Sequence, residues 1–233
     1  MRYINKIIIS LLFITSFSLT VFAWDITIDL DYITENPVNS RGCVVNILEN
    51  TVTATVPEDG SVLIKGDGTN GGLGWGIVIF DASYIFIEDG TVILGSSGRS
   101  GLSLISENSI TVSGGGPDIA VTSVTGGALY TNAPNLTLEG ELGEIIGGNR
   151  PEALFGGLGI VASNLFISGQ IALIAGGMGG VSNGEAILTV NDGKTTITGN
   201  VNVNGFLHTN LTLRNGGELQ RQFGVPLSIL LRK

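Results

Sequence analysis

The sequence repeats itself between residues 126 and 177. Segment 135–140 (NLTLEG) recurs as 164–169 (NLFISG), and segment 145–148 (IIGG) recurs more loosely as 173–177 (LIAGG). Self-similarity at a fixed period is typical of solenoids, in which each repeat is a structural unit that buries its apolar face against the next repeat. The repeat therefore predicts a stacked architecture.

One recurring strand sets the period of the repeat. Its first apolar positions are Ile85, Ile110, Leu136 and Leu165, which lie at nearly even intervals along the chain. Each repeat holds three short runs of alternating or apolar residues divided by bends with Gly or Asn, and no helical period is present after residue 23. This pattern predicts an all-β fold, a right-handed single-stranded parallel β-helix with three faces. A β-sandwich is the alternative, but its turns need not recur with the same side chains at one offset.

The N-terminus has the features of a targeting segment. Arg2 and Lys6 precede an apolar run that ends at Ala23, as expected for a signal peptide over residues 1–23; an uncleaved anchor is the alternative. We expect export, no transmembrane segment after cleavage, an N-terminal cap over residues 24–60 and a β-helix over residues 61–233. Cys43 is the only cysteine, so an intramolecular disulfide is excluded.

Composition narrows the class of partner. Only 13% of the 233 residues are charged and 43% are hydrophobic, which argues against disorder. The net charge of −9 argues against nucleic acid and against an anionic membrane surface.

Four asparagines precede the recurring strand by one or two positions: Asn108, Asn135, Asn164 and Asn210. Asn tolerates left-handed backbone angles, and its amide can bond to main-chain groups near a bend. We predict that these amides stack at one corner of the solenoid and hydrogen-bond to one another. Asn135 and Asn210 also begin Asn-x-Thr patterns for N-glycosylation, which is the alternative interpretation.

Residues for catalysis are sparse. The carboxylates are scattered through the bends, and no pair occupies matching positions of adjacent repeats in the predicted alignment. His208 is the only histidine, so a His-based metal cluster or proton relay lacks a second member. The glycine runs 114–116 and 176–180 are not followed by the helix and Lys-Ser/Thr of a phosphate loop, and we interpret them as tight corners with positive φ. No catalytic residue, metal site or cofactor is predicted.

Aromatic residues offer a candidate binding face. We predict that Phe86 and Phe166 occupy equivalent outward positions with Thr111 and Thr137 between them, and that Trp75 belongs to the same binding surface. Such a mixed apolar and hydroxyl surface suits a glycan or a surface protein. The aromatic residues that could stack on a sugar are Trp75, Tyr84, Phe86, Tyr130, Phe155 and Phe166.

Two tetrapeptides resemble a known family. Gly126, Gly127, Ala128 and Leu129 match a GGA-[aliphatic] motif, and residues 146–149, which end in Asn149, resemble FxxN with Ile in the Phe position. These motifs resemble the passenger repeats of chlamydial-type polymorphic outer membrane proteins over about residues 74–200. The resemblance implies a surface-displayed, adhesin-like β-helix carried by an autotransporter barrel. The roughly twenty residues after residue 213 are too few for a barrel, so we expect a secreted, periplasmic or partner-anchored solenoid.

The predicted function is therefore an exported, non-enzymatic β-solenoid that serves as an adhesin-like binding or structural module at the cell surface, with a separate membrane anchor as a candidate partner. Two alternatives stay open. One is a carbohydrate-active β-helix enzyme, similar to a polysaccharide lyase or glycoside hydrolase, which requires paired carboxylates on one face. The other is a structural envelope component without a ligand.

Overall fold

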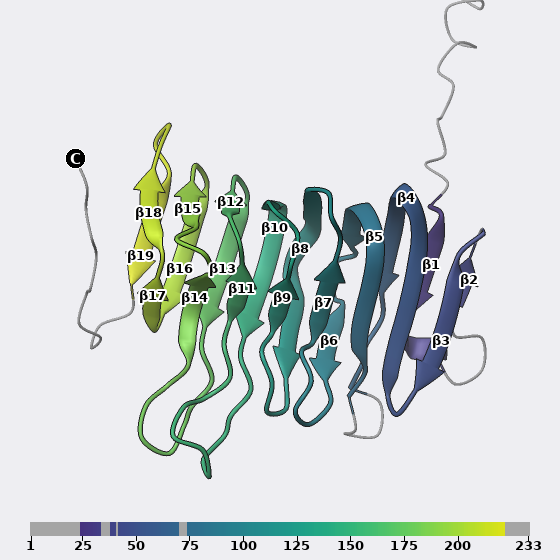
Figure 1. The fold of residues 1–233 in the computed structure, drawn as a ribbon, viewed down its shortest axis with the longest axis horizontal. Helices are drawn as coiled ribbons and strands as arrows, with labels where there is room; N and C mark the ends of the chain where they lie inside the picture. The colour runs from purple at the N-terminus through teal and green to yellow at the C-terminus, as the bar shows by residue number, and fades with distance from the viewer. Residues whose placement is uncertain (1–23, 34–37, 41, 70–73, 222–233) are drawn as a thin grey trace, which may run out of the picture.

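The computed structural model describes residues 24–33, 38–40, 42–69 and 74–221, and the expected signal peptide lies outside the described residues. These residues form an all-β parallel solenoid of about 6 turns, in which the only helix described is the single turn η1 (Leu30–Tyr32) (Figure 1). The predicted parallel β-helix is confirmed, and its right-handedness stays a prediction.

Three faces run along the solenoid, and each joins strands from successive turns in parallel register. The first face contains the first halves of β4 (Thr51–Lys65) and β5 (Gly76–Ile87), then β7 (Leu102–Ile105), β9 (Leu129–Thr131), β11 (Ile160–Ala162), β14 (Glu185–Thr189) and β17 (Phe206–His208). The second face contains β1 (Ile26–Asp29), the second halves of β4 and β5, the first halves of β8 (Ile110–Ser123) and β10 (Leu136–Ile146), then β12 (Leu165–Ile167), β15 (Lys194–Ile197) and β18 (Asn210–Leu213). The third face contains β6 (Val92–Gly95), the second halves of β8 and β10, then β13 (Gln170–Ala175), β16 (Asn200–Asn204) and β19 (Glu218–Arg221).

The turns that the structure describes are of similar length until the last of them, which we call the last turn. On the second face, paired residues follow one another as Ile85, Val112, Leu138, Ile167, Ile197 and Leu213. The steps are nearly even as far as Ile197, and the step from Ile197 to Leu213 is much shorter. The last turn therefore has about half the chain length of the turns before it.

The observed register corrects the predicted alignment at one step. Ile85 pairs with Val112 and not with Ile110, whereas Ile110, Leu136 and Leu165 are paired as predicted. A shift of two positions keeps the same side chains inward, because side chains alternate with a period of two, so hydrophobic alternation does not distinguish the two registers.

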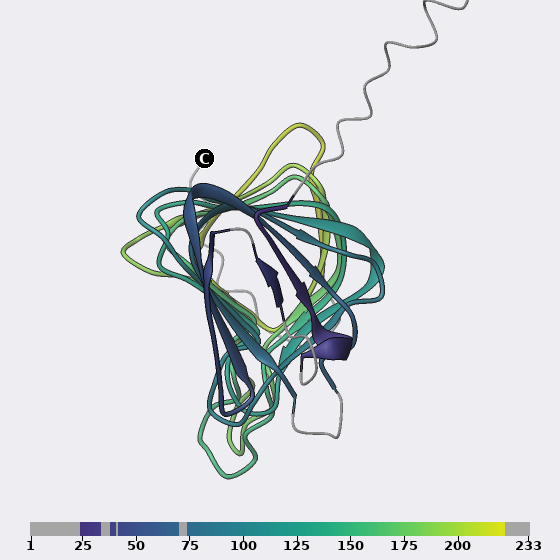
Figure 2. The ribbon, with the colours of Figure 1, turned by 90° about the vertical axis from the view of Figure 1, so that its right-hand side faces the viewer.

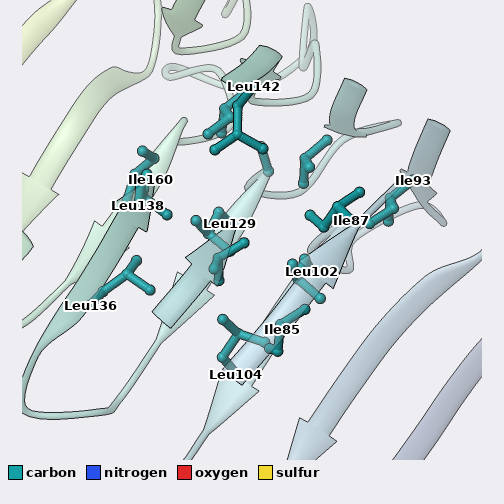
Figure 3. Packing of buried hydrophobic residues seen from close by; sticks show 14 of the residues in the cluster. Ile85, Ile87, Ile93, Leu102, Leu104, Leu129, Leu136, Leu138, Leu142 and Ile160 are labelled. Carbon is teal, nitrogen blue, oxygen red and sulfur yellow. The ribbon is translucent and has the colours of Figure 1, made fainter. Parts of the chain in front are cut away.

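Aliphatic side chains fill the interior of the turns. The inward residues of the second face, such as Ile85 and Leu138, meet those of the first face, such as Leu104, and all three are fully or almost fully buried (Figure 3). Burial of such a side chain contributes roughly 1.5–3 kcal/mol relative to its exposure to water. The interior is thus the main source of stability, as for other solenoids.

Several strands continue through the corners that were expected to separate them. Strands β4 and β5 bend at Asp59 and Asp81, whose φ angles are +63° and +66°, and β10 bends at Gly140 with φ +70°. A single left-handed residue redirects the chain, and Asp and Gly tolerate that conformation better than most residues. The domain boundary expected at residue 60 consequently falls inside β4.

The interpretation of the glycine runs as positive-φ corners is wrong. Residues 114–116 lie within β8, and none of them has a positive φ. A Cβ atom at Gly114 would instead clash with the carbonyl oxygen of Glu141 in the next turn, and one at Gly177 would clash with that of Gly148. Close approach of neighbouring turns, not backbone angle, is the reason for glycine there.

Two antiparallel strands lie at the N-terminal end of the stack. β2 (Val38–Ser40) pairs with β1, and β3 (Val44–Leu48) pairs with the first half of β4. The thiol of Cys43, just before β3, is half-buried and lies 3.5 Å from the main-chain oxygen of Asp25. The role of this region as a cap stays a prediction. Among the described residues, no helix has the length and apolar character needed to cross a bilayer.

Candidate binding groove beside the last turn

The short last turn leaves a step at this end of the solenoid, which we call the ledge, because the connections of the turn before it are longer. In the turn before it, residues 176–184 connect β13 to β14 and residues 190–193 connect β14 to β15, whereas the matching connections in the last turn are single residues, Gly205 and Thr209. The longer connections therefore project past the last turn. Figure 2 shows the turns nearly superimposed along the solenoid axis, with the loops between β10 and β11 and between β13 and β14 extending away from the common outline.

Three adjoining hollows lie along this ledge, with volumes of about 640, 700 and 630 Å³. The first and second share Glu185 and Phe206, and the second and third share Asp192 and Asn210. Together they form one groove that follows β17 and β18, which we call the β17 groove. Its functional side chains are Arg150, Phe155, Asn183, Glu185, Asp192, Lys194, Phe206, His208, Asn210 and Arg214.

One end of the β17 groove is aromatic. Phe155 is exposed on the loop between β10 and β11, and Phe206 is exposed at the start of β17. The loop that carries Phe155 pairs with the following loop through parallel bridges from Arg150 to Gly179 and from Phe155 to Ser182. Main-chain hydrogen bonds, such as 2.8 Å from the Gly177 nitrogen to the Gly157 oxygen, continue the ladder between these loops. The aromatic end is therefore fixed by backbone bonding.

The middle of the groove is polar. His208 Nδ1 lies 3.3 Å from Glu185 Oε1. Beneath them the hydroxyl of Thr209 lies 2.8 Å from the hydroxyls of both Thr189 and Thr195, two buried residues of the preceding turn. A hydroxyl can both donate and accept, so the three groups satisfy one another where the aliphatic interior ends.

The far end of the groove carries mixed charge. Lys194 and Arg214 supply cations beside the carboxylate of Asp192. In the part of the chain that the structure describes, no group of three or more His, Cys, Asp or Glu side chains could hold a metal ion. The groove therefore offers neutral hydrogen-bonding groups, charged groups of both signs and an aromatic surface.

The four corner asparagines bond to the preceding turns. Asn135 Nδ2 donates to Ser109 Oγ at 3.0 Å, and Asn164 Nδ2 donates to the Pro134 oxygen at 2.9 Å. Asn210 Nδ2 reaches the oxygens of residues 192 and 193 at 3.2 and 3.3 Å, and Asn108 Nδ2 reaches Glu58 Oε1 at 3.5 Å. These partners are groups of earlier turns and not the other corner amides, so the bonds differ from the predicted amide-to-amide stack.

The three aromatic residues of the predicted binding face do not share one row. Trp75 packs against the core just before β5. Phe86 lies opposite Ser113 and stacks on Trp24, with ring centroids 5.9 Å apart. The row of Phe166 contains Thr137, Thr111 and then Tyr84. The predicted equivalence of Phe86 and Phe166 is therefore wrong, because the register differs from the predicted alignment at this step.

The residues of the family-like motif support the stacking of the loops. Ala128 and Leu129 are buried in the core. The Gly126 oxygen accepts a hydrogen bond of 2.8 Å from the Gly148 nitrogen, and Asn149 Oδ1 accepts one of 2.8 Å from the Met178 nitrogen. Gly127 lies beside them at the start of the first face, where a Cβ atom would find room.

At two corners the carboxylate of one Asp accepts a hydrogen bond from the main chain of another Asp. The Asp67 nitrogen donates to Asp31 Oδ1 at 2.7 Å, and the Asp118 nitrogen donates to Asp89 Oδ1 at 3.1 Å. In both pairs one carboxylate accepts a main-chain hydrogen bond from the next turn, which is a structural role. The sequence alignment did not reveal these neighbours, because they belong to bends of unequal length.

Sequence reasoning identified Phe155 as a candidate sugar-stacking residue and His208 as the only histidine, but it missed the groove. The sequence feature that indicates the groove is the short spacing from Thr195 to Leu211, which is about half of the spacing from Leu165 to Thr195. No family model, curated protein or solved structure matches this chain.

Proposed function

We propose that this protein is an exported, non-catalytic binding module, similar in role to an adhesin, and that its β17 groove binds an extended oligosaccharide. The observation that carries the proposal is the sudden shortening of the last turn, which leaves an open groove lined by aromatic and hydrogen-bonding side chains.

The chemistry of the groove matches that of a sugar chain. A saccharide presents C–H faces that pack on aromatic rings and hydroxyls that both donate and accept hydrogen bonds. Phe155 and Phe206 supply the aromatic surface, and Glu185, His208 and Asn210 supply acceptors and donors next to it. Three adjoining hollows suit a chain of several units better than a single small molecule.

The proposal that the protein does not catalyse a reaction rests on the contacts and positions of two acidic residues in the groove. Glu185, the acid in the centre of the groove, is engaged with His208 at 3.3 Å, and Asp192 is exposed at a corner. A glycosidase needs two carboxyl groups that flank the bond to be cleaved, one of them with a raised pKa. Glu185 and Asp192 lie in the same groove, so their substitution is the direct test of the enzyme alternative.

Export to the cell surface, the medium or the periplasm is proposed from the basic and apolar residues 1–23, and display at the surface is proposed from the resemblance of the repeats to polymorphic outer membrane passengers. A paired set of loops held by main-chain bonds at one edge of a rigid stack supports a presenting role. Fractionation of cells that express the full-length protein tests this part separately, and retention in the cytoplasm would contradict it.

The binding experiment screens the full-length protein against a panel of neutral and acidic oligosaccharides by calorimetry. We expect at least one to bind, and we expect Phe206→Ala to weaken that binding by at least about tenfold, as expected when an aromatic side chain is removed from a binding site. Phe166→Ala is the matched control, because Phe166 is similarly exposed (40% against 36% for Phe206) but is not one of the residues that line the groove.

A reducing-end assay on the same oligosaccharides separates binding from catalysis. We expect no release of sugar. Release that Glu185→Gln or Asp192→Asn abolishes would replace the binding module by a carbohydrate-active enzyme. Binding that survives Phe206→Ala unchanged would move the site away from the β17 groove, and the lack of any bound saccharide would favour a structural component.

A further inference from the structure

The N-terminal end of the solenoid exposes an apolar edge strand. β3 is connected to β4 by the two-residue turn Glu49–Asn50, and both turn residues have positive φ angles, +47° and +59°. Among the described residues, β4 is the only strand that pairs with β3. Val44 and Leu48 are 62% and 69% exposed, and Ile47 is also exposed.

The second edge of β3 has main-chain groups in a defined pattern. In a hairpin with a two-residue turn, the pair next to the turn is hydrogen-bonded, and bonded and non-bonded pairs then alternate. Leu48, Asn46 and Val44 therefore direct their main-chain groups to β4, whereas Val45 and Ile47 direct theirs to the open edge. The open edge thus presents two donors and two acceptors.

The segment is self-complementary about Asn46. If two copies run antiparallel with Asn46 opposite Asn46, then Val45 meets Ile47 of the second copy in both halves and four main-chain hydrogen bonds form. On the outward side Val44 meets Leu48, so the exposed aliphatic residues meet one another. Residues 44–48 contain no charge that would oppose this pairing. Natural edge strands usually carry Lys, Pro or a bulge that prevents it.

We propose that β3 pairs antiparallel with β3 of a second copy of this chain, about a two-fold axis at Asn46, to form an end-to-end dimer. Such an interface is isologous and closes after two copies, so it yields a dimer and not a fibre. The arrangement places the two β17 grooves at the far ends of a doubled solenoid and leaves both accessible. The proposal stands independently of what the groove binds.

Sedimentation equilibrium of the full-length protein tests the dimer. We expect a mass twice that of the monomer and expect Asn46→Lys, which sets two ammonium groups opposite each other, to raise the dissociation constant at least about tenfold. Thr53→Lys is the matched control, because Thr53 pairs with Asn46 but lies one strand inward. An equimolar mixture of Asn46→Lys and Asn46→Asp proteins should restore association, which misfolded variants would not do.

A cross-link tests the register itself. Opposite residues of a non-hydrogen-bonded antiparallel pair have Cα atoms about 4.5 Å apart, within the range of a disulfide, about 4.4–6.8 Å. In a Cys43→Ser background, Asn46→Cys should give a covalent dimer on mild oxidation, and Thr53→Cys should not. A monomer at all concentrations, association that Asn46→Lys leaves unchanged, or equal cross-linking at positions 46 and 53 would overturn the proposal.

Discussion

The middle turns and the last turn of this solenoid are built on the same three faces, yet they differ in what fills and surrounds them. From β5 to β13 the turns are of nearly equal length and share a continuous aliphatic interior. In the last turn, the short chain from Ile197 to Leu213 encloses a smaller outline, and Thr189, Thr195 and Thr209 bring hydroxyls together at the end of the interior. Turn length therefore distinguishes the two regions: turns of equal length cover one another, and the shorter turn leaves the groove in which we propose that a saccharide binds.

The largest expected effect compares the middle of one row with its end. Leu138 is fully buried in the middle, and Leu213 of the same row is 49% exposed at the end. Leu138→Ala should lower the free energy of unfolding by about 2–5 kcal/mol, because it removes buried methyl groups and leaves a cavity. Leu213→Ala should cost less than about 1 kcal/mol. Urea unfolding measures both, and equal losses would contradict the contrast between the two regions.

The next effect concerns two adjacent glycines between middle turns. A Cβ atom at Gly126 would clash with the main-chain oxygen of Arg99, whereas one at Gly127 would find its nearest neighbour, the Leu158 oxygen, at 3.4 Å. We therefore expect Gly126→Ala to destabilise the protein by about 1–3 kcal/mol, and Gly127→Ala to be nearly neutral. Thermal unfolding of the two variants measures the difference. If Gly127→Ala lowered the stability more than Gly126→Ala, the explanation by close packing would be contradicted.

A smaller effect comes from the hydroxyls at the end of the interior. Thr195→Val keeps the shape of the side chain and removes its hydrogen bond to Thr209, so it should cost about 0.5–1.5 kcal/mol. Thr196→Val, at the next position and half-buried on the outward side, should change the free energy by less than about 0.5 kcal/mol. If Thr195→Val instead stabilises the protein, the hydroxyl cluster is not a satisfied network.

The smallest effect depends on pH. The hydrogen bond of 2.8 Å from Lys65 to the Asp29 carboxylate raises the pKa of Lys65 above its usual value of 10.5. Because the folded-state pKa is the higher one, the ion pair contributes fully below pH 10.5 and is lost as the pH rises through the folded-state value. The half-exposed pair should contribute about 0.2–1 kcal/mol. The difference in unfolding free energy between the wild type and Lys65→Met should shrink above pH 10.5, and a difference that stays constant above that pH would contradict the contribution of the ion pair.

More of the fold than of the candidate site could be predicted from the sequence. The Asn-bearing bends and the inward aliphatics at Leu136 and Leu165 predicted the parallel stack and the strand that defines it. The alternation of side chains has a period of two, so it does not decide whether Ile85 pairs with Ile110 or with Val112. The predicted pairing placed Phe86 opposite Thr111, whereas Phe86 lies opposite Ser113. Whether a bend interrupts a strand depends on a single backbone angle, as at Asp81, and sequence alone does not determine that angle.

The groove could not be predicted from the sequence, because no sequence motif encodes it. It arises from the difference between two consecutive turns, one with residues 176–184 between β13 and β14 and one with Gly205 alone in the matching position. Its lining residues, such as Glu185 and Phe206, are ordinary one by one and are brought together only by the register of β14 with β17. The short spacing from Thr195 to Leu211 was visible in the sequence, but its meaning required the turns to be aligned.

Hydrogen exchange of the full-length protein, measured with and without a bound oligosaccharide, tests the central contrast most directly. We expect the amides of β8 and β10 to exchange slowest and those of β17 and β18 fastest, with the saccharide slowing exchange only in the segments that line the groove, residues 150–158 and 182–214. Uniform protection along the solenoid, or slowing by the saccharide confined to the middle turns, would contradict the division into a stable middle and a binding end.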